Sequence, residues 1–370
     1  MSRVKDLLAG TGYWLGWKAL SHLPESWVRW GFSTVTDIAW RRQGHGVQVL
    51  EGNLLRVLGP GISGKELRQV SRAGMRSYGR YWMEVFRLPA ISPERILRDM
   101  QLNADIEQAL NDALNGQGVI LALPHMGNWE VAGAYVVARG IKFATVAERL
   151  KPESLFDMFL KFREGLGMEV LPLTGGPNVF GVLAQRLRAG HMVCLLCDRD
   201  LTESGVEVDF FGDRARMAAG PAALAVQTGA SLRAVTLWFT EDGWYAHASP
   251  DIPVPAEGNR KEKAAAMTQQ LAAAFEKRIS EHPQDWHMLQ RVFISDLDPA
   301  RLPGPQSAPA GPVPGSAVPG SAGPGSAGPG SAGPGSTGPE AGGGRSVWSA
   351  PTPGPCPAAC SSTSGTWPRR

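Results

Sequence analysis

The chain has 370 residues, 43% of them apolar, which is enough to bury a substantial core in one large α/β domain or two smaller ones. A formal net charge of only +3 does not indicate a nucleic-acid-binding protein, so no nucleic acid partner is expected. Four cysteines are too few for a disulfide framework in a protein of this size.

The N-terminal region is rich in tryptophan and in basic side chains. Six Lys and Arg residues oppose three Asp and Glu residues in the first fifty positions. Basic residues combined with tryptophans are typical of a membrane interface, so residues 1–60 are predicted to be a helical region that associates with an anionic membrane surface. The alternative is that the tryptophans pack in the core. The five tryptophans of this region are Trp14, Trp17, Trp27, Trp30 and Trp40.

Two features bear on localisation. No uninterrupted apolar stretch reaches about eighteen residues, so no transmembrane helix is expected. The apolar segment near the N-terminus is broken by Gly, Trp and Lys18 and lacks a small-residue cleavage site, which argues against a secretory signal peptide. We therefore expect a peripheral protein on the cytoplasmic face of the cell inner membrane.

A long amphipathic helix is predicted next. Ser63 and Glu66 form a capping box at its start, and Pro89 ends it. A row of arginines recurs every four residues on the face opposite the apolar one, where like charges repel each other. This row either is solvated or contacts anionic headgroups or acidic side chains. It consists of Arg68, Arg72, Arg76 and Arg80.

After residue 115, apolar strands alternate with helices, which predicts a largely parallel central sheet flanked by helices on both faces. Ligands of such sheets bind at the carboxyl ends of the strands, where His125 and the run Asp198-Arg199-Asp200 fall. The predicted strands cover 118–123, 143–147, 168–173, 191–197, 231–239 and 244–249, and the predicted helices cover 128–140, 154–167, 178–190 and 222–230.

The composition changes from Arg301 onward, where proline recurs every five residues among Gly, Ser and Ala. Such a segment cannot bury enough apolar area to offset the entropy lost on ordering. The folded part is therefore predicted to be residues 1–302, and residues 303–370 are predicted to be a disordered tail.

His125 and Glu130 flank the junction at which a buried strand turns into a helix. Across such a junction the two side chains can meet, so Glu130 could accept a hydrogen bond from one ring nitrogen and leave the other to take a proton. This arrangement suits general-base catalysis. A metal site is not expected, because HExxH is absent and one His with one Glu does not bind a metal ion alone.

The stretch HMGNWE, residues 125–130, resembles the HxxxxD/E motif of glycerolipid and lipid A acyltransferases. Four further segments follow in the order of that family: FREGLG, LLCDRDL, VEVDFFGDRARMAAGPAALAVQTGA and HPQDWHMLQRVF. The resemblance covers nearly all of residues 1–300, and it identifies residues 1–302 as an acyltransferase domain. The stretch VAERLKPESLFDMFLKFREGLGMEVLPL looks most like the actinobacterial phosphatidylinositol mannoside acyltransferases.

The resemblance implies transfer of a fatty acyl group from acyl-CoA to a mannose hydroxyl of phosphatidylinositol mannoside. His125 would remove the hydroxyl proton, and Glu130 would hold the imidazole and stabilise its charged form. Acyl-CoA would be a co-substrate, with no other cofactor.

The candidate substrate-binding residues are arginines and a short acidic run. Arg163 and Arg149 could bind the phosphates of CoA or of inositol, because a guanidinium matches phosphate oxygens. Asp198 and Asp200 could bind sugar hydroxyls or hold Arg199 or His125. A structural salt bridge is the simpler interpretation of this run.

Two other functions stay open at this point. A thioesterase or lipid hydrolase would use the same histidine and carboxylate with water in place of the sugar hydroxyl. A non-catalytic, membrane-associated lipid-binding protein would have the same lipid contacts without turnover. Release of CoA that depends on the glycolipid acceptor would distinguish the transferase from both.

Overall fold

The computed structural model describes residues 20, 23–147, 160–173, 178–200 and 205–297. The predicted tail, Trp14, Trp17 and Arg149 lie outside these described residues.

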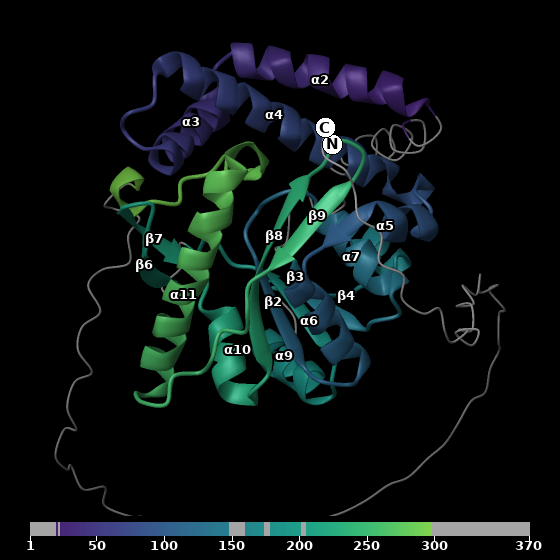
Figure 1. Ribbon diagram of the computed structural model, residues 1–370, viewed down its shortest axis with the longest axis vertical. Helices are drawn as coiled ribbons and strands as arrows, with labels where there is room; N and C mark the ends of the chain where they lie inside the picture. Colours follow the sequence, from purple (N-terminus) through teal and green to yellow (C-terminus); the bar gives the residue numbers. More distant parts are fainter. Residues whose placement is uncertain (1–19, 21–22, 148–159, 174–177, 201–204, 298–370) are drawn as a thin grey trace, which may run out of the picture. The chain divides into compact units, whose positions relative to one another are not determined.

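A sheet of seven strands forms the centre of the described part (Figure 1). The strand order is β1-β9-β8-β2-β5-β3-β4. Neighbouring strands are parallel except for β8 and β9, which are antiparallel. The prediction of a largely parallel α/β sheet is therefore confirmed. The strands are β1 (Met100–Leu102), β2 (Val119–Leu123), β3 (Phe143–Ala147), β4 (Glu169–Pro172), β5 (Met192–Leu196), β8 (Ser231–Phe239) and β9 (Trp244–Ala248).

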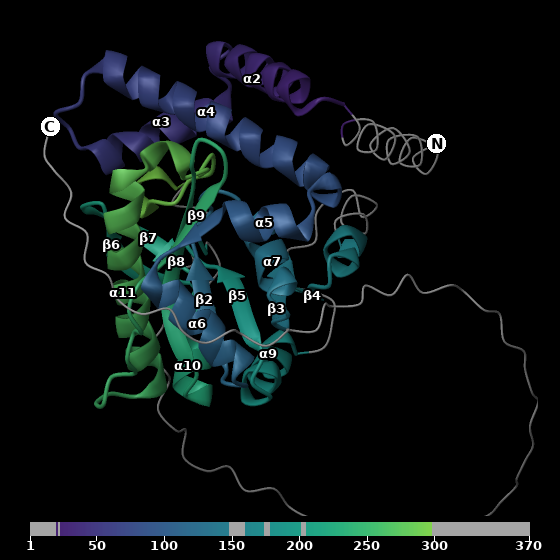
Figure 2. The same cartoon turned by 45° about the vertical axis from the view of Figure 1, so that its right-hand side comes forward.

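Helices cover both faces of this sheet, and each face has its own apolar core (Figure 2). One core packs α5 (Pro93–Asp99), α6 (Ala104–Leu114) and α7 (Trp129–Ala138) against the sheet. The other packs α9 (Val179–Arg188), α10 (Gly220–Thr228) and α11 (Arg260–Glu281). Strand β2 is buried at all five positions, as expected for a central strand covered on both sides.

A separate two-stranded sheet, β6 (Val206–Phe210) with β7 (Asp213–Met217), was not among the predicted elements. Its first strand alternates apolar and polar residues, V-E-V-D-F, which is the pattern of a half-buried strand. The turn between the strands places Phe211 and Gly212 at positive φ angles of 50° and 73°. The strands and helices that were predicted after residue 115 are all present, as far as the described residues cover them.

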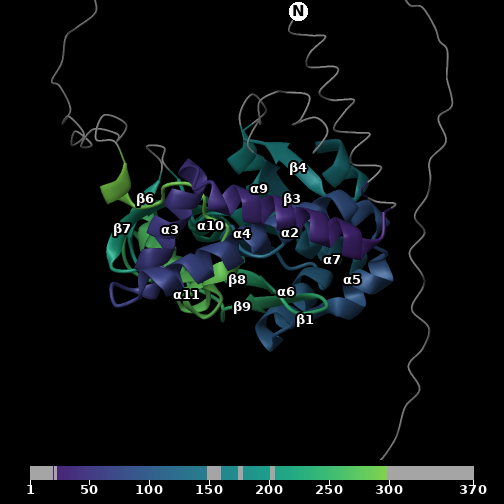
Figure 3. The same ribbon diagram turned by 90° about the horizontal axis from the view of Figure 1, so that it is seen from above.

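Three helices, α2 (Glu25–Arg41), α3 (His45–Leu58) and α4 (Gly64–Arg87), form a further layer that lies across the carboxyl end of the central strands (Figures 1 and 3). Helix α4 is the predicted amphipathic helix, and the capping box of Ser63 and Glu66 is present.

The arginine row of α4 contacts acidic side chains. Arg72 and Arg76 both hold Asp37 of α2, with closest N···O distances of 2.5 and 2.7 Å. Arg68 contacts Glu51 of α3 at 3.0 Å. Of the interpretations left open by the sequence, internal ion pairing is confirmed, and the row holds the three helices together.

Candidate active site

His125 and Asp198 meet at the carboxyl edge of the sheet. Strands β2 and β5 are parallel neighbours in which Leu123 pairs with Leu196, so the residues two positions further along each strand come side by side. His125 Nδ1 lies 2.6 Å from Asp198 Oδ1, and the His125 backbone N–H donates to Asp198 Oδ2 at 2.9 Å. Of the alternatives left open for Asp198, a contact with His125 is the one that the structure shows.

The Asp198 carboxylate is fully buried and accepts a third hydrogen bond, from the indole Nε1 of Trp286 at 3.0 Å. Every oxygen of the carboxylate therefore has a donor, which removes most of the cost of burying its charge. Sequence reasoning missed Trp286. The family-like segment HPQDWHMLQRVF contains it, but nothing in that segment indicates a contact with a residue 88 positions away.

The pKa values of His125 and Asp198 shift in the directions that favour an imidazolium–carboxylate pair. Burial opposes the charge on His125, but the charge and hydrogen bond of Asp198 outweigh it and raise the pKa of His125 above its ordinary value of 6.5. Burial likewise opposes the charge on Asp198, and His125 with the other donors holds the pKa of that carboxyl below 3.8. The site is thus built to stabilise His125 once it has taken a proton.

The loop after His125 has a backbone conformation that glycine alone fits. Gly127 has a φ of 61°, and a Cβ there would lie 2.5 Å from the Leu237 carbonyl oxygen. The loop is fixed by backbone hydrogen bonds, in which Gly127 N–H donates to the Asp285 carbonyl at 2.9 Å and His287 N–H donates to the His125 carbonyl at 2.7 Å.

A second histidine near the loop is unsuited to act as a base. His287 is buried, and its Nε2 lies 2.8 Å from the hydroxyl of Ser77, which donates to Asp285 at 2.5 Å. Burial lowers the pKa of His287 to about 3, with a smaller contribution from His125. Burial also raises the pKa of Asp285 to about 6. His125 differs in that its side chain keeps 37% of its surface exposed. Its role as the base of the reaction stays a prediction.

Glu130 does not hold the imidazole, so the expected contact with His125 was wrong. Its buried carboxylate pairs with Arg163, whose Nε lies 3.0 Å from Oε2 and whose Nη2 contacts Oε1. The reason is that Glu130 lies in the first turn of α7, where its side chain lines the pocket between α7 and the sheet. Asp198, in contrast, comes two residues after the end of β5, just as His125 comes two residues after the end of the neighbouring strand β2. A catalytic role for Glu130 stays a prediction.

The other predicted substrate-binding residues are only partly brought together. Arg163 lies under α7 with its guanidinium on Glu130. Arg199 and Asp200 follow Asp198, and the Arg199 Nε donates to the Arg291 carbonyl at 3.2 Å. Their contacts with substrate stay predictions.

A pocket that is partly open to solvent lies between α7 and the sheet, lined mainly by apolar side chains together with the Glu130–Arg163 pair. Its walls include Leu121 and Leu123 of β2, Gly133 of α7 and Phe143 of β3. Trp129 also lines it, and the ring of Trp129 lies 5.6 Å from that of His125 between centroids. Trp129 therefore places this pocket next to His125.

Glu130→Gln should lower the free energy of unfolding by about 3 kcal/mol, because a buried guanidinium loses its charged partner. Glu169→Gln is the matched control, since it breaks a comparable ion pair with Arg186 that is more exposed. The Glu169 side chain is 34% exposed and the Arg186 side chain is 32% exposed. The control should lose less than about 1 kcal/mol. Chemical denaturation of both variants measures the difference, and equal losses would contradict a buried structural pair at Glu130.

Comparison with known proteins shows which family the chain resembles. Residues 5–295 match the family of bacterial lipid A biosynthesis acyltransferases. The chain is 46% identical over 303 residues to a phosphatidylinositol mannoside acyltransferase of Mycobacterium tuberculosis, covering 81% of this chain and 93% of that protein. It is 44% identical over 302 residues to the protein of that name from Mycolicibacterium smegmatis, covering 81% and 94%. Because the family model matches most of the chain and these relatives cover 81% of it, the chain belongs to the bacterial lipid A biosynthesis acyltransferase family.

Proposed function

We propose that this acyltransferase transfers a fatty acyl group from acyl-CoA to a mannose hydroxyl of phosphatidylinositol mannoside. The observation that carries the proposal is the His125–Asp198 pair next to an apolar pocket. The pair supplies a base for a sugar hydroxyl, and the pocket suits a fatty acyl chain. The identity of the acceptor follows the names of the two mycobacterial relatives.

In this mechanism the chemistry is done by one nitrogen of His125. Nδ1 is held by Asp198, so Nε2 accepts the proton as the sugar oxygen attacks the thioester carbonyl. The carbon–sulfur bond then breaks, and the proton on Nε2 passes to the departing thiolate of CoA. Asp198 stabilises the imidazolium between these two proton transfers without itself taking a proton.

A CoA-release assay tests the proposal. We expect CoA release from palmitoyl-CoA that depends on purified mannosylated phosphatidylinositol, with the acylated glycolipid as the second product. Equal release with and without glycolipid would instead indicate a thioesterase.

The outer face of α2 is suited to an anionic lipid surface. Trp27 and Trp30 are 70% and 73% exposed, and Ile38 on the same face is 43% exposed. Among the helices that the structure describes, none is both long and apolar enough to cross a bilayer. We propose that α2 lies in the membrane interface, on the cytoplasmic side where acyl-CoA is found. The predicted role of the α4 arginine row in headgroup binding is not carried forward, because acidic side chains already occupy it.

Replacing both Trp27 and Trp30 with alanine should reduce vesicle binding, most clearly at high salt, because insertion of apolar rings does not depend on ionic strength. The measurement is flotation with vesicles containing anionic lipid at low and at high salt. Leu114→Ala is the matched control, since it removes a side chain that is 49% exposed on α6. Flotation of the double variant at the wild-type level would contradict the assignment of α2 to the interface.

A further inference from the structure

We infer that Glu84 of α4 is a positioning residue of the reaction, which acts through Asn128 to hold the loop that carries His125. The inference rests on the proposed acyl transfer. It assigns a role to a buried carboxylate that lies 41 positions before the histidine in sequence and contacts Asn128 of the loop.

Asn128 is the first part of this connection. Its side-chain Oδ1 accepts from the backbone N–H groups of Glu130 and Val131, at 3.2 Å each, and so caps the N-terminus of α7. Its Nδ2 donates to Glu84 Oε2 at 2.8 Å. Because the oxygen meets two N–H donors and the nitrogen meets a carboxylate, only one orientation of the amide satisfies all three contacts.

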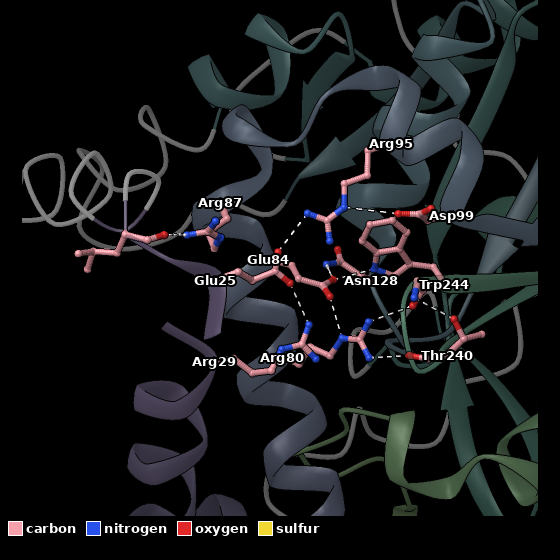
Figure 4. Close-up of polar contacts among 12 residues, drawn as sticks. Glu25, Arg29, Arg80, Glu84, Arg87, Arg95, Asp99, Asn128, Thr240 and Trp244 are labelled. Carbon is pink, nitrogen blue, oxygen red and sulfur yellow. Dashed lines mark hydrogen bonds and ion pairs between the residues drawn. The ribbon is translucent and has the colours of Figure 1, made fainter. Parts of the chain in front are cut away.

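Glu84 is the second part, and both of its oxygens are engaged (Figure 4). Oε2 also accepts from the indole Nε1 of Trp244 at 2.7 Å, and Oε1 accepts from Arg80 Nε at 2.7 Å. Arg80 in turn donates to the carbonyl oxygens of Thr240 and Gly243, at 2.8 and 3.0 Å. Because Glu84 is only 4% exposed, any displacement of its carboxylate would leave buried donors without an acceptor.

The loop between β2 and α7 is therefore held on two sides. The backbone of residues 285–287 holds it at His125 and Gly127. The Glu84–Asn128 contact holds it at the position where α7 begins. A shift of the loop's end would move His125 Nδ1 away from Asp198. A displacement of about 1 Å at a reacting group can cost about 100-fold in rate.

The test removes the amide donor from the contact. Asn128→Asp keeps a capping oxygen but places a second carboxylate against Glu84, so we expect kcat to fall about 10- to 100-fold while the KM of each substrate changes less than about threefold. An imidazole displaced from Asp198 also loses part of the interaction that raises its pKa, so the rising limb of kcat/KM should shift to lower pH. A loss of stability without a loss of position would produce neither the split between kcat and KM nor this shift.

The controls separate this inference from its premises. Asn178→Ala removes the N-cap of α9, which accepts from Gly181 N–H at 3.2 Å, and should leave kcat unchanged. Circular dichroism verifies folding. If Asn128→Asp does not fold, Asn128→Ser replaces it, since serine retains a capping oxygen but is too short to reach Glu84, and the same fall in kcat is expected. Wild-type kcat in the folded variant, or a rising limb of kcat/KM at the wild-type pH, overturns the inference. Wild-type protein without acceptor-dependent transfer overturns the proposed function instead.

Discussion

His125→Ala should lower kcat for acyl transfer by about 1,000-fold or more, because the reaction loses the group that accepts the hydroxyl proton. The protein should remain folded, since this side chain is 37% exposed and contributes little to either apolar core. The measurement is acceptor-dependent CoA release at saturating substrates, accompanied by thermal unfolding.

The pH dependence of the wild-type enzyme gives an independent check on the same residue. A general base acts in its neutral form, and Asp198 raises the pKa of His125 above 6.5. The rising limb of kcat/KM should therefore have its midpoint above pH 6.5, and activity should be lost as the pH falls through that midpoint. Transfer at the normal rate by a folded His125→Ala protein would remove His125 from the mechanism.

Asp198→Asn should lower kcat by about 100- to 10,000-fold and shift the rising limb of the pH profile to lower pH. The shift follows from the sign of the interaction: the carboxylate raises the pKa of His125, so its neutralisation lets the ring lose its proton at a lower pH. The rate falls because an amide nitrogen facing Nδ1 favours the tautomer in which Nε2 carries the proton and cannot accept another.

A matched control for this substitution is Asp213→Asn. Asp213 also has a lowered pKa, from its hydrogen bond with Ser295 and its contact with Arg56, but it lies in β7. The control should retain the kcat and the pH profile of the wild type. An Asp198→Asn enzyme with an unshifted rising limb would show that the carboxylate does not act through the imidazole.

The sequence was sufficient to locate the site but not to assign its contacts. Alternating strands and helices predict a parallel sheet, and the rule that ligands bind at strand ends brings His125 and Asp198 to one edge. The five-residue spacing of His125 and Glu130 specifies closeness along the chain but not the direction of either side chain. Sequence reasoning therefore assigned Glu130 as the carboxylate partner of the imidazole, although Asp198, the partner in the structure, was among the candidates.

Contacts between distant parts of the chain could not be predicted from the sequence, for a different reason. Trp286 and Glu84 lie 88 and 44 positions from the residues that they hold, and neither has a local pattern that distinguishes it from a core tryptophan or a helix-surface glutamate. For the arginine row of α4 the spacing left a solvated face, headgroups and acidic side chains as alternatives. Only the packing of α2 and α3 on α4 decides between them.

Helix α4 contacts both α2 and the loop that carries His125. Its 24 residues correspond to about 36 Å at 1.5 Å per residue. Arg72 and Arg76 fix α2 to it, and Glu84 fixes the loop of His125 to it. If α2 lies at the lipid surface, the imidazole of His125 is held at a fixed distance from the bilayer. Among similar hydroxyls of the sugar, the one that lies at that distance from the bilayer is then the one acylated.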